Sequence, residues 1–413
     1  MAKKVVIAGG GASGLMAAIF AARNQAEVVI IEHKDRVGKK ILMTGNGKCN
    51  LTNMSDFKGK YNSNNLSFVY HILENFDAGA TREFFKEIGL YTKEKRDGGV
   101  YPVSEQAAVV LDTLRTECAR LGVETRTNCH AYKIETGDKK GILYYEQTDE
   151  KTVKKQIPFD ALILATGSKA ASVSGSDGSG YDLAKKIGHH IIQPLPALVQ
   201  LRCKEDYFKQ ISGVRAQAKL ALFIEHTYVM SEEGELQLTD YGISGIPTFQ
   251  ISRHAAKAVA DRKDCEVHID FLTYLSETEI EQLLADKDKF SYKTIEEFLA
   301  GLVHKKLASF VCKQQGIKAS TLLKEVRSEK LAACIRNLKE LVVHVKEPNS
   351  FDNAQICCGG VPLTEMELTM QSKKNKKIYL TGELLDCDGI CGGYNLQWAW
   401  ATGAIAGMNA AKD

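Results

Sequence analysis

Three glycines near the start of the chain have the spacing of a phosphate-binding turn. Gly9, Gly11 and Gly14 form the pattern G-x-G-x-x-G directly after the apolar run 5–8. In this pattern the first glycine permits a tight turn, the second lets the backbone approach a pyrophosphate, and the third lets a helix pack on the preceding strand. The start of that helix presents unpaired N–H groups to the phosphates.

An acidic residue at a suitable distance strengthens this interpretation. A second β-branched run, 28–31, ends at Glu32. That position is about 20 residues after the glycines, where such sites place the carboxylate that binds a ribose hydroxyl. An ordinary Gly-rich turn is the alternative, but strand, helix, second strand and acid are all in register here. The sequence therefore predicts an adenine dinucleotide site, and Glu32 favours FAD or NAD over NADP.

The segment that follows, 36–53, is a loop rich in glycine, lysine and asparagine. A plain nicotinamide-binding domain continues from its second strand into a helix instead. The loop is either a second long contact with an extended cofactor or a surface loop, and these residues alone favour neither.

Cysteine pairs near the end of the chain do not have the spacing of a redox or metal site. Cys357 and Cys358 are adjacent, and Cys387 and Cys391 are separated by three residues, so neither pair is C-x-x-C. No histidine lies close to them in sequence. We interpret all four as small buried thiols and predict no metal site.

The elements that would position these residues follow two different patterns. Residues 160–167 form another buried strand that ends in a glycine turn, and 396–411 form a helix that is apolar nearly all round and therefore buried. Between them, alternation at 219–225 indicates antiparallel strands. Ser276 and Glu279 form a capping box that opens a helical segment.

Two further stretches carry specific expectations. Short strand signals at 123–127, 130–135 and 141–146 predict a small meander attached to the nucleotide-binding domain. Residues 242–247 are predicted to be a turn-rich stretch within the antiparallel part.

The predicted fold is therefore α/β with two insertions. A Rossmann-like dinucleotide-binding domain takes 1–190 and 356–413. An inserted antiparallel β domain, of barrel type with a sandwich as the alternative, takes 191–275 and 340–355. A small helical insert takes 276–339.

Composition excludes several classes of protein. The 413 residues carry 54 Lys and Arg against 51 Asp and Glu, a net charge of +3 without a basic block, so no nucleic-acid partner is expected. The 11 cysteines are scattered, which favours reduced thiols in a cytoplasmic protein. No run of 18 apolar residues is present, so no membrane span is expected.

Motifs spread over the whole chain match one known family. They occupy 9–14, 44–53, 165–167 with 175–181, 241–245, 359–361 and 382–397. On these motifs the chain resembles the BaiN/RdsA family of FAD-dependent oxidoreductases, which includes aminoacetone-oxidase-like and dehydro-bile-acid-reductase-like flavoproteins. The stretches at 44–53 and 382–397 are the most specific of them.

The resemblance implies a resident FAD held by both ends of the chain. Its phosphate and adenosine half would be bound by Ala12, Ser13, Gly14, Glu32, Ala131, Thr166 and Gly167. Its flavin side would be lined by Lys40, Thr44, Gly45, Gly47, Lys48, Cys49 and Asn50. The ribityl chain would meet Gly382, Glu383, Asp388 and Gly389, and the flavin ring would meet Tyr394, Asn395 and Leu396.

Two points follow for the chemistry. Lys48 stands where the family often has arginine, so the charge is kept but the guanidinium fork is lost, and its contact is left open. Residues 392–396 lead into the last predicted helix, whose positive end would face the flavin N1 and C2 carbonyl, where reduced flavin gathers negative charge.

No catalytic acid or base is identified from the sequence. Tyr241, Glu365 and Glu383 lie in or near the matching motifs, but a structural hydrogen bond is the favoured role of each. Cys49 lies in the flavin-side loop, although the flavin alone suffices for the chemistry.

The resemblance implies three possible activities. The first is reduction of a conjugated enone, such as a dehydro-bile-acid-like compound, with NADH or NADPH as a transient electron donor. The second is oxidation of small amines to give hydrogen peroxide, and the third is a non-catalytic redox sensor. The single G-x-G-x-x-G pattern means that NAD(P)H would reach the flavin without a Rossmann domain of its own.

Overall fold

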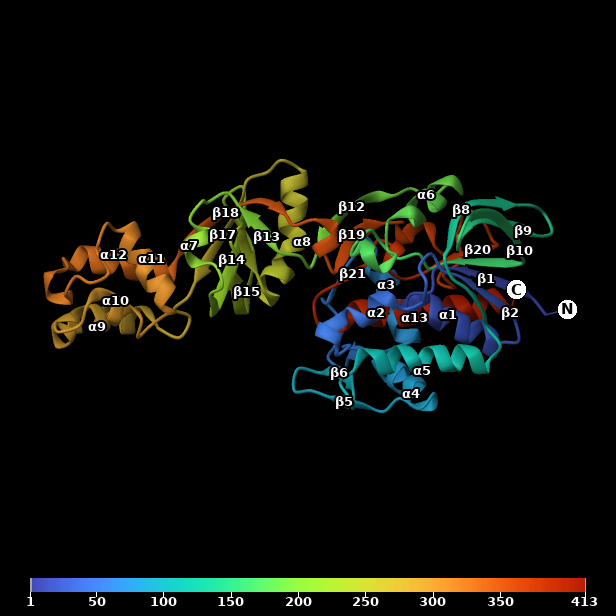
Figure 1. Cartoon of the computed structure of the whole chain (residues 1–413), viewed down its shortest axis with the longest axis horizontal. Helices are drawn as coiled ribbons and strands as arrows, with labels where there is room; N and C mark the ends of the chain where they lie inside the picture. The colour runs from blue at the N-terminus through green and yellow to red at the C-terminus, as the bar shows by residue number, and fades with distance from the viewer. Residues whose placement is uncertain (1, 413) are drawn as a thin grey trace. The chain divides into compact units, whose positions relative to one another are not determined.

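We describe a computed structural model of the chain, which covers residues 2–412. The chain divides into two compact units, Met1–Leu195 with Gln355–Asp413, and Pro196–Ala354 (Figure 1). Each unit has its own apolar core. Among the described helices, none is long and apolar enough to cross a membrane.

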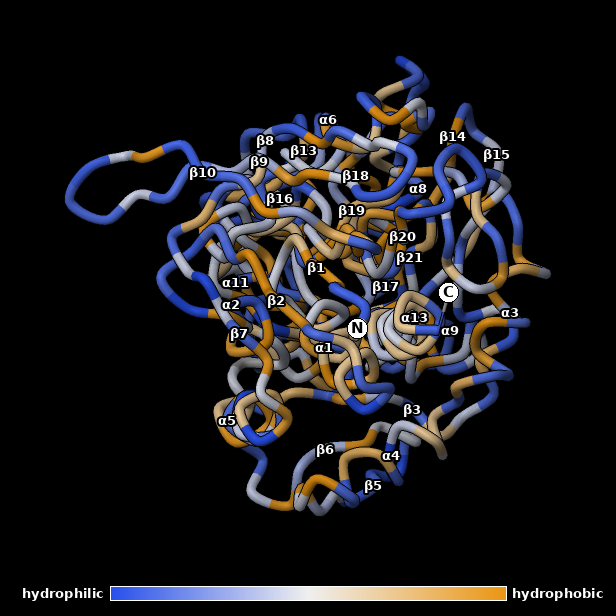
Figure 2. The backbone as a smooth tube through the Cα atoms, turned by 90° about the vertical axis from the view of Figure 1, so that its right-hand side faces the viewer, coloured by the Kyte–Doolittle hydropathy of each residue, from blue (hydrophilic) through white to orange (hydrophobic). Residues whose placement is uncertain are grey.

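A five-stranded parallel sheet forms the centre of the first unit. Its order is β20 (Ile378–Leu380), β11 (Ala161–Leu164), β1 (Lys4–Ala8), β2 (Glu27–Ile31) and β7 (Glu124–Arg126). Val5 pairs with Val28 on one side and with Ala161 on the other. Figure 2 shows hydrophobic residues along β1 and β2, as expected for parallel strands that are covered on both faces.

The described helices of the first unit are α1 (Ala12–Arg23), α2 (Lys39–Leu42), α3 (Leu66–Asn75), α4 (Ala78–Glu87), α5 (Ala107–Arg120), α6 (Ser179–Lys186) and α13 (Tyr394–Lys412). The first and the last of them, α1 and α13, pack closely together. Gly403 and Gly407 of α13 face α1 so closely that a Cβ would lie 2.4 Å from Ser13 O and 2.3 Å from Ala17 O, respectively. The two ends of the chain thus form one layer (Figure 1).

Smaller sheets complete the first unit. A meander has the order β10 (Thr152–Phe159), β9 (Gly141–Thr148) and β8 (Cys129–Thr136). The shorter sheets are β3 (Thr52–Asn53), β6 (Gly99–Pro102) and β5 (Thr92–Glu94), then β21 (Asp388–Gly389) with β4 (Tyr61–Asn62), and β12 (Ile192–Ala197) with β19 (Ile356–Gly360).

The predicted meander was wrong in its first strand. The segment predicted at 123–127 is β7, which pairs in parallel with β2 and extends the main sheet, while β10 supplies the third strand of the meander. The edge position of β7 depends on long-range pairing, which a local strand signal does not show.

A closed barrel forms the centre of the second unit. Its order is β13 (Leu201–Cys203), β16 (Gly242–Ser244), β15 (Thr227–Leu238), β14 (Arg215–Ile224), β17 (Cys265–Asp270) and β18 (Leu341–Pro348). The helices are α7 (Phe208–Ile211), α8 (Ile246–Ala260), α9 (Glu277–Ala285), α10 (Ile295–Leu299), α11 (Lys305–Gln314) and α12 (Ser328–Lys339).

These elements confirm the predicted fold class, an α/β Rossmann domain with an inserted antiparallel barrel. The helices α9–α12 lie between β17 and β18 in sequence and share one apolar core with the barrel. Their separation into a domain of their own stays a prediction. Residues 242–247 are not a turn-rich stretch, because they hold β16 and the first turn of α8, with Pro247 in that turn.

Candidate functional site

The turn from β1 to α1 has the geometry of a phosphate cradle. Gly9 has φ +103°, and a Cβ there would lie 2.4 Å from Ala165 O at the end of β11. A Cβ on Gly14 would lie 2.0 Å from Gly9 O, so α1 can approach the strand only without a side chain. Gly11 has no atom within 4 Å of a Cβ position, which leaves its backbone open to a ligand. Gly11 is also the N-cap residue of α1, and no side-chain hydrogen bond from it occupies the first amides of that helix.

Three observations test whether FAD fits these residues, and all are favourable. The first turn of α1 contains no acidic residue, so the amides of Ala12, Ser13 and Gly14 face no competing carboxylate from that turn. The Oγ1 of Thr166 is buried and has no hydrogen-bond partner. The same is true of Asn50 Oδ1. Orphaned buried oxygens of this kind are expected where a ligand completes the hydrogen bonding.

Glu32 is fixed in place at the end of β2 and is 7% exposed. The amide of Gly10 donates to its Oε2 (2.7 Å), and the amide of Lys34 donates to its Oε1 (2.8 Å). Burial raises the pKa of Glu32 above its ordinary value of 4.5, whereas the two amide donors oppose that shift. Each carboxylate oxygen keeps a lone pair, so Glu32 can accept ribose hydroxyls without losing its backbone contacts.

The start of β8 lies beside Glu32. The amide of Cys129 donates to Glu32 O (2.8 Å), and Ala131 follows two residues later at an irregularity in the strand. The rings of His33 and His130 contact each other here in a tilted arrangement, with centroids 4.6 Å apart. The structure therefore brings Ala131 to the same end of the sheet as Glu32.

The loop after α2 combines a tight backbone with a buried thiol. Thr44–Gly47 form a 3₁₀ turn, and the Thr44 hydroxyl donates to Ile41 O (2.6 Å). Burial raises the pKa of Cys49 to about 11, so its thiol stays protonated near neutral pH and is unsuited to thiolate chemistry. Lys48 forms an ion pair with Glu105 (3.2 Å), which gives this lysine a protein partner that the sequence did not suggest.

An ion pair joins this loop to the last segment of the chain. Lys40 Nζ lies 2.6 Å from Glu383 Oε2, and the Ser168 hydroxyl donates to the same oxygen (2.8 Å). Both charged side chains are largely shielded from solvent. Lys40 and Glu383 were predicted to contact the cofactor, but their pairing across 343 residues leaves no local sequence signal.

The segment before α13 is fixed by hydrogen bonds from that helix. The Asn395 side chain accepts from Gly389 N and donates to Gly389 O, both at 2.8 Å. Trp398 Nε1 donates to Gly382 O (3.1 Å). Tyr394 O accepts from the Tyr61 hydroxyl (2.8 Å). Asp388 is buried, and Leu396 is half-buried.

Sequence reasoning missed a buried polar residue on α13 that connects three segments. Gln397 Oε1 accepts from the hydroxyls of Thr52 (2.6 Å) and Thr81 (2.8 Å), and its Nε2 donates to Phe76 O (2.7 Å). A polar residue in an otherwise apolar helix was the signal that could have identified it. This network holds the segment 50–53 against the start of α13.

The candidates for a catalytic acid or base all have protein partners. Glu365 Oε2 lies 2.7 Å from His189 Nδ1, and the ring of His189 also contacts the Ser372 hydroxyl. The Tyr241 hydroxyl accepts from Asn349 in the second unit (3.2 Å).

The parallel sheet, the open glycine turn and the fixed acid after the second strand define an adenine-dinucleotide-binding protein. The family model described as HI0933-like protein Rossmann domain matches residues 3–409, and the chain belongs to this family.

Comparison with curated proteins agrees with this family assignment. The chain is 42% identical over 413 residues to a 3-dehydro-bile acid delta(4,6)-reductase of Clostridium scindens, with 99% of each chain covered. It is 27% identical to a ribosomal RNA dihydrouridine synthase of Haemophilus influenzae, covering 99% of this chain and 98% of the relative.

Among solved structures, quinol fumarate reductase FrdA of Escherichia coli matches with a TM-score of 0.51. The match has 15% identity and covers 99% of this chain and 70% of that one. At this identity the likeness shows the fold alone. The family and its relatives confirm the predicted resemblance, and the chain is an FAD-dependent oxidoreductase.

Proposed function

We propose that the protein reduces a carbon–carbon double bond conjugated to a carbonyl in a small, steroid-like compound. The observation that carries this proposal is the similarity to the Clostridium scindens reductase, at 42% identity over the whole chain. The more distant relatives are ribosomal RNA dihydrouridine synthases. The uracil ring of uridine also has a C5=C6 double bond conjugated to its C4 carbonyl. Reduction of a conjugated double bond is therefore the chemistry common to these relatives.

We also propose that NADH or NADPH supplies the electrons as a transient visitor. Among residues 2–412, the parallel sheet of the first unit carries one glycine-rich dinucleotide turn, and the barrel of the second unit is antiparallel. A nicotinamide donor would thus bind without a Rossmann domain of its own and leave before the substrate is reduced.

Bound FAD supplies hydride transfer, and the protein supplies position and electrostatics. The open turn at Gly11 and the amides of Ala12 and Ser13 would bind the pyrophosphate, with Glu32 on the ribose. The start of α13 would present its amides to the flavin N1 and C2 carbonyl. The contacts between Asn395 and Gly389 support this role, because they fix the backbone just before that helix.

All 11 cysteines are free thiols, which supports our proposal that the protein works in the reducing cytoplasm.

The test is an anaerobic panel on the FAD-loaded protein. NADH and NADPH are tried as reductants, and the reduced flavin is then mixed with a 3-oxo-4,6-diene bile acid, with uridine-containing ribosomal RNA, or with buffer. Reduction by a nicotinamide and reoxidation by the bile acid are expected. If ribosomal RNA reoxidises the flavin and the bile acid does not, the substrate would be uridine in RNA. Reduction by aminoacetone, with peroxide on re-aeration, would support the oxidase, and failure of every pair would support a non-catalytic sensor.

A further inference from the structure

One face of the β5–β6 hairpin carries lysines and tyrosines, and we call it the hairpin face. Side chains alternate along a strand, so Tyr91, Lys93 and Lys95 share one face of β5 and its flanking residues. Lys93 is paired with Tyr101 of β6, which places both on the same face. The Val103 amide donates to Tyr91 O (3.0 Å), which continues this register and adds Val103 to the face. Lys95 Nζ lies 3.9 Å from the centre of the Tyr101 ring.

Three lysines converge on a single carboxylate at the hairpin face. Lys93 Nζ lies 2.7 Å from Glu105 Oε1, and Lys95 Nζ lies 3.8 Å from the same oxygen. Lys48 reaches Glu105 Oε2 from the flavin-side loop (3.2 Å). These ammonium groups, Lys93 first, lower the pKa of Glu105 to about 2. The turn between the strands adds one base and one acid, which cancel, so the face keeps an excess of two positive charges.

The hairpin face is accessible and partly apolar. The hairpin lies at the edge of the first unit (Figure 1). Tyr91 is 68% exposed and Val103 is 57% exposed. The side chains of Lys48, Lys93 and Lys95 are also partly exposed. An exposed aromatic ring beside ammonium groups is suited to nucleotides, because the ring stacks on a base while the cations bind phosphates.

The hairpin face borders the segment that we assign to the flavin. Strand β6 pairs with β3, which begins two residues after Asn50. A Cβ on Gly99 would lie 3.1 Å from Asn50 Nδ2 and 3.2 Å from the Tyr101 ring. The orphaned Asn50 Oδ1 lies 2.9 Å from the position of a Cβ on Gly393, directly before α13. A ligand on the hairpin face would therefore lie close to the flavin end of the proposed FAD site.

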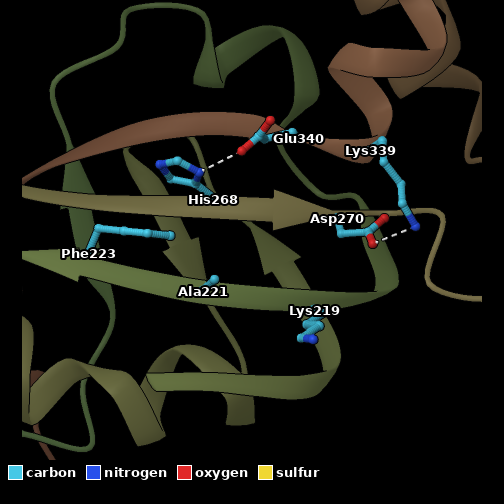
Figure 3. A pocket seen from close by; sticks show the side chains of 7 residues that line it. All are labelled: Lys219, Ala221, Phe223, His268, Asp270, Lys339 and Glu340. Atoms are coloured by element: carbon cyan, nitrogen blue, oxygen red, sulfur yellow. Dashed lines mark hydrogen bonds and ion pairs between the residues drawn. The ribbon is translucent and has the colours of Figure 1, made fainter. Parts of the chain in front are cut away.

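The lysine-lined cavity of the second unit differs from the hairpin face in its charge. This cavity of about 240 Å³ lies on the barrel (Figure 3). Its Lys339 is paired with Asp270 (3.0 Å), its Glu340 is paired with His268 (2.9 Å), and Lys219 also lines it. Two lysines thus face two carboxylates there, whereas the three lysines of the hairpin face share one acid. The excess charge that attracts an anion belongs to the hairpin face.

We propose that the hairpin face binds a phosphate group of the nicotinamide dinucleotide that reduces the FAD, an inference that rests on the proposed function. Lys48, Lys93 and Lys95 would bind the phosphate, and Tyr91 would stack on the adenine ring. The pyrophosphate of either donor carries two negative charges, and the 2′-phosphate of NADPH carries nearly two, so each matches the excess of two positive charges. Glu105 holds the same ammonium groups in the structure and would release them to the phosphate.

The experiment follows anaerobic reduction of the FAD-loaded full chain by NADH and by NADPH in a stopped-flow spectrometer. Lys93→Gln and Lys95→Gln should each raise the half-saturating donor concentration about 3- to 10-fold and leave the limiting rate unchanged, because each removes one exposed charge contact. Glu105→Gln should lower that concentration, since it removes the competing carboxylate. The exposed ion pair of Lys86 and Glu83 on α4 (3.2 Å) supplies the matched controls. Lys86→Gln and Glu83→Gln should change neither quantity.

The choice of donor identifies the phosphate. If both lysine variants weaken saturation by NADH and NADPH alike, the pyrophosphate lies on the hairpin face. If they weaken saturation by NADPH alone, the 2′-phosphate lies there. Inorganic pyrophosphate is an independent probe: it should compete with the donor in wild type and compete more weakly in the Lys93→Gln, Lys95→Gln double variant.

Three results would overturn the proposal. The first is an unchanged half-saturating concentration of both donors in K93Q, K95Q and E105Q, which would leave the proposed function standing without this face. The second is no reduction of the FAD by either nicotinamide, which would remove the proposed donor itself. The third is slower reoxidation by ribosomal RNA in the lysine variants with unchanged reduction by NADH and NADPH, which would assign the hairpin face to the RNA backbone.

Discussion

Replacing Gly403 by alanine tests how α13 supports the phosphate cradle. The new Cβ would lie 2.4 Å from Ser13 O and 3.0 Å from Met16 Cβ, whereas ordinary van der Waals contact begins at about 3.4 Å. The helices α1 and α13 must therefore separate by about 1 Å at this point. Ser13 is in the first turn of α1, so the displacement reaches the amides that we assign to the pyrophosphate.

Two opposing effects set the change in stability that Gly403→Ala causes. Overpacking of a close contact costs about 1–3 kcal/mol, and alanine in a helix gains up to about 1 kcal/mol over glycine. Gly79→Ala, at an exposed position of α4, has the second effect without the backbone clash. Relative to that control, we expect the Tm of Gly403→Ala to fall by about 2–12 °C.

FAD binding gives the second measurement. Loss of one hydrogen bond to a charged phosphate is worth about 1.5–3 kcal/mol, so the Kd for FAD, measured by fluorescence titration of the apoprotein, should rise about 10- to 100-fold. A Gly403→Ala protein with the Tm and FAD affinity of the Gly79→Ala control would refute the proposed link between α13 and the cradle.

Three other predictions concern single side chains. Gln397→Leu leaves the Thr52 and Thr81 hydroxyls and Phe76 O unpaired inside the protein, so the free energy of unfolding in urea should fall by at least about 3 kcal/mol; a loss below about 1 kcal/mol would contradict this network. Burial and the neighbouring His130 lower the pKa of His33 below its ordinary value of 6.5. Its protonation therefore opposes folding, and the stability linked to it is complete above pH 6.5 and is lost as the pH falls below that value. The Tm of His33→Asn should thus fall less than the Tm of wild type between about pH 7 and 5.5. Parallel curves of Tm against pH for the two proteins would exclude this role. Asn395→Ala frees the backbone of Gly389 and should shift the reduction potential of bound FAD in a dye-equilibrium titration, whereas an unchanged potential would argue against helix α13 facing the flavin.

The nucleotide-binding half was predictable because its signals are local. Gly9, Gly11, Gly14 and Glu32 sit within one strand–helix–strand segment, where turn geometry and burial act over a few residues. The antiparallel barrel was likewise visible as alternation along β14.

Long-range contacts were not predictable in the same way. The Lys40–Glu383 ion pair and the Gln397 network join segments more than 300 residues apart, so no spacing rule applies to them. The helix α8 was missed because its first turn contains Pro247 after two glycines, a composition that is typical of turns as well as of helix starts.

The most direct test of the proposed function is an anaerobic single turnover. Protein with reduced FAD is mixed with a 3-oxo-4,6-diene bile acid, and the flavin and diene absorbances are followed together. We expect the flavin to reoxidise at the rate at which the diene chromophore disappears, with one double bond saturated per FAD. Flavin that stays reduced until oxygen is admitted, or that reoxidises while the diene stays intact, would contradict the proposal.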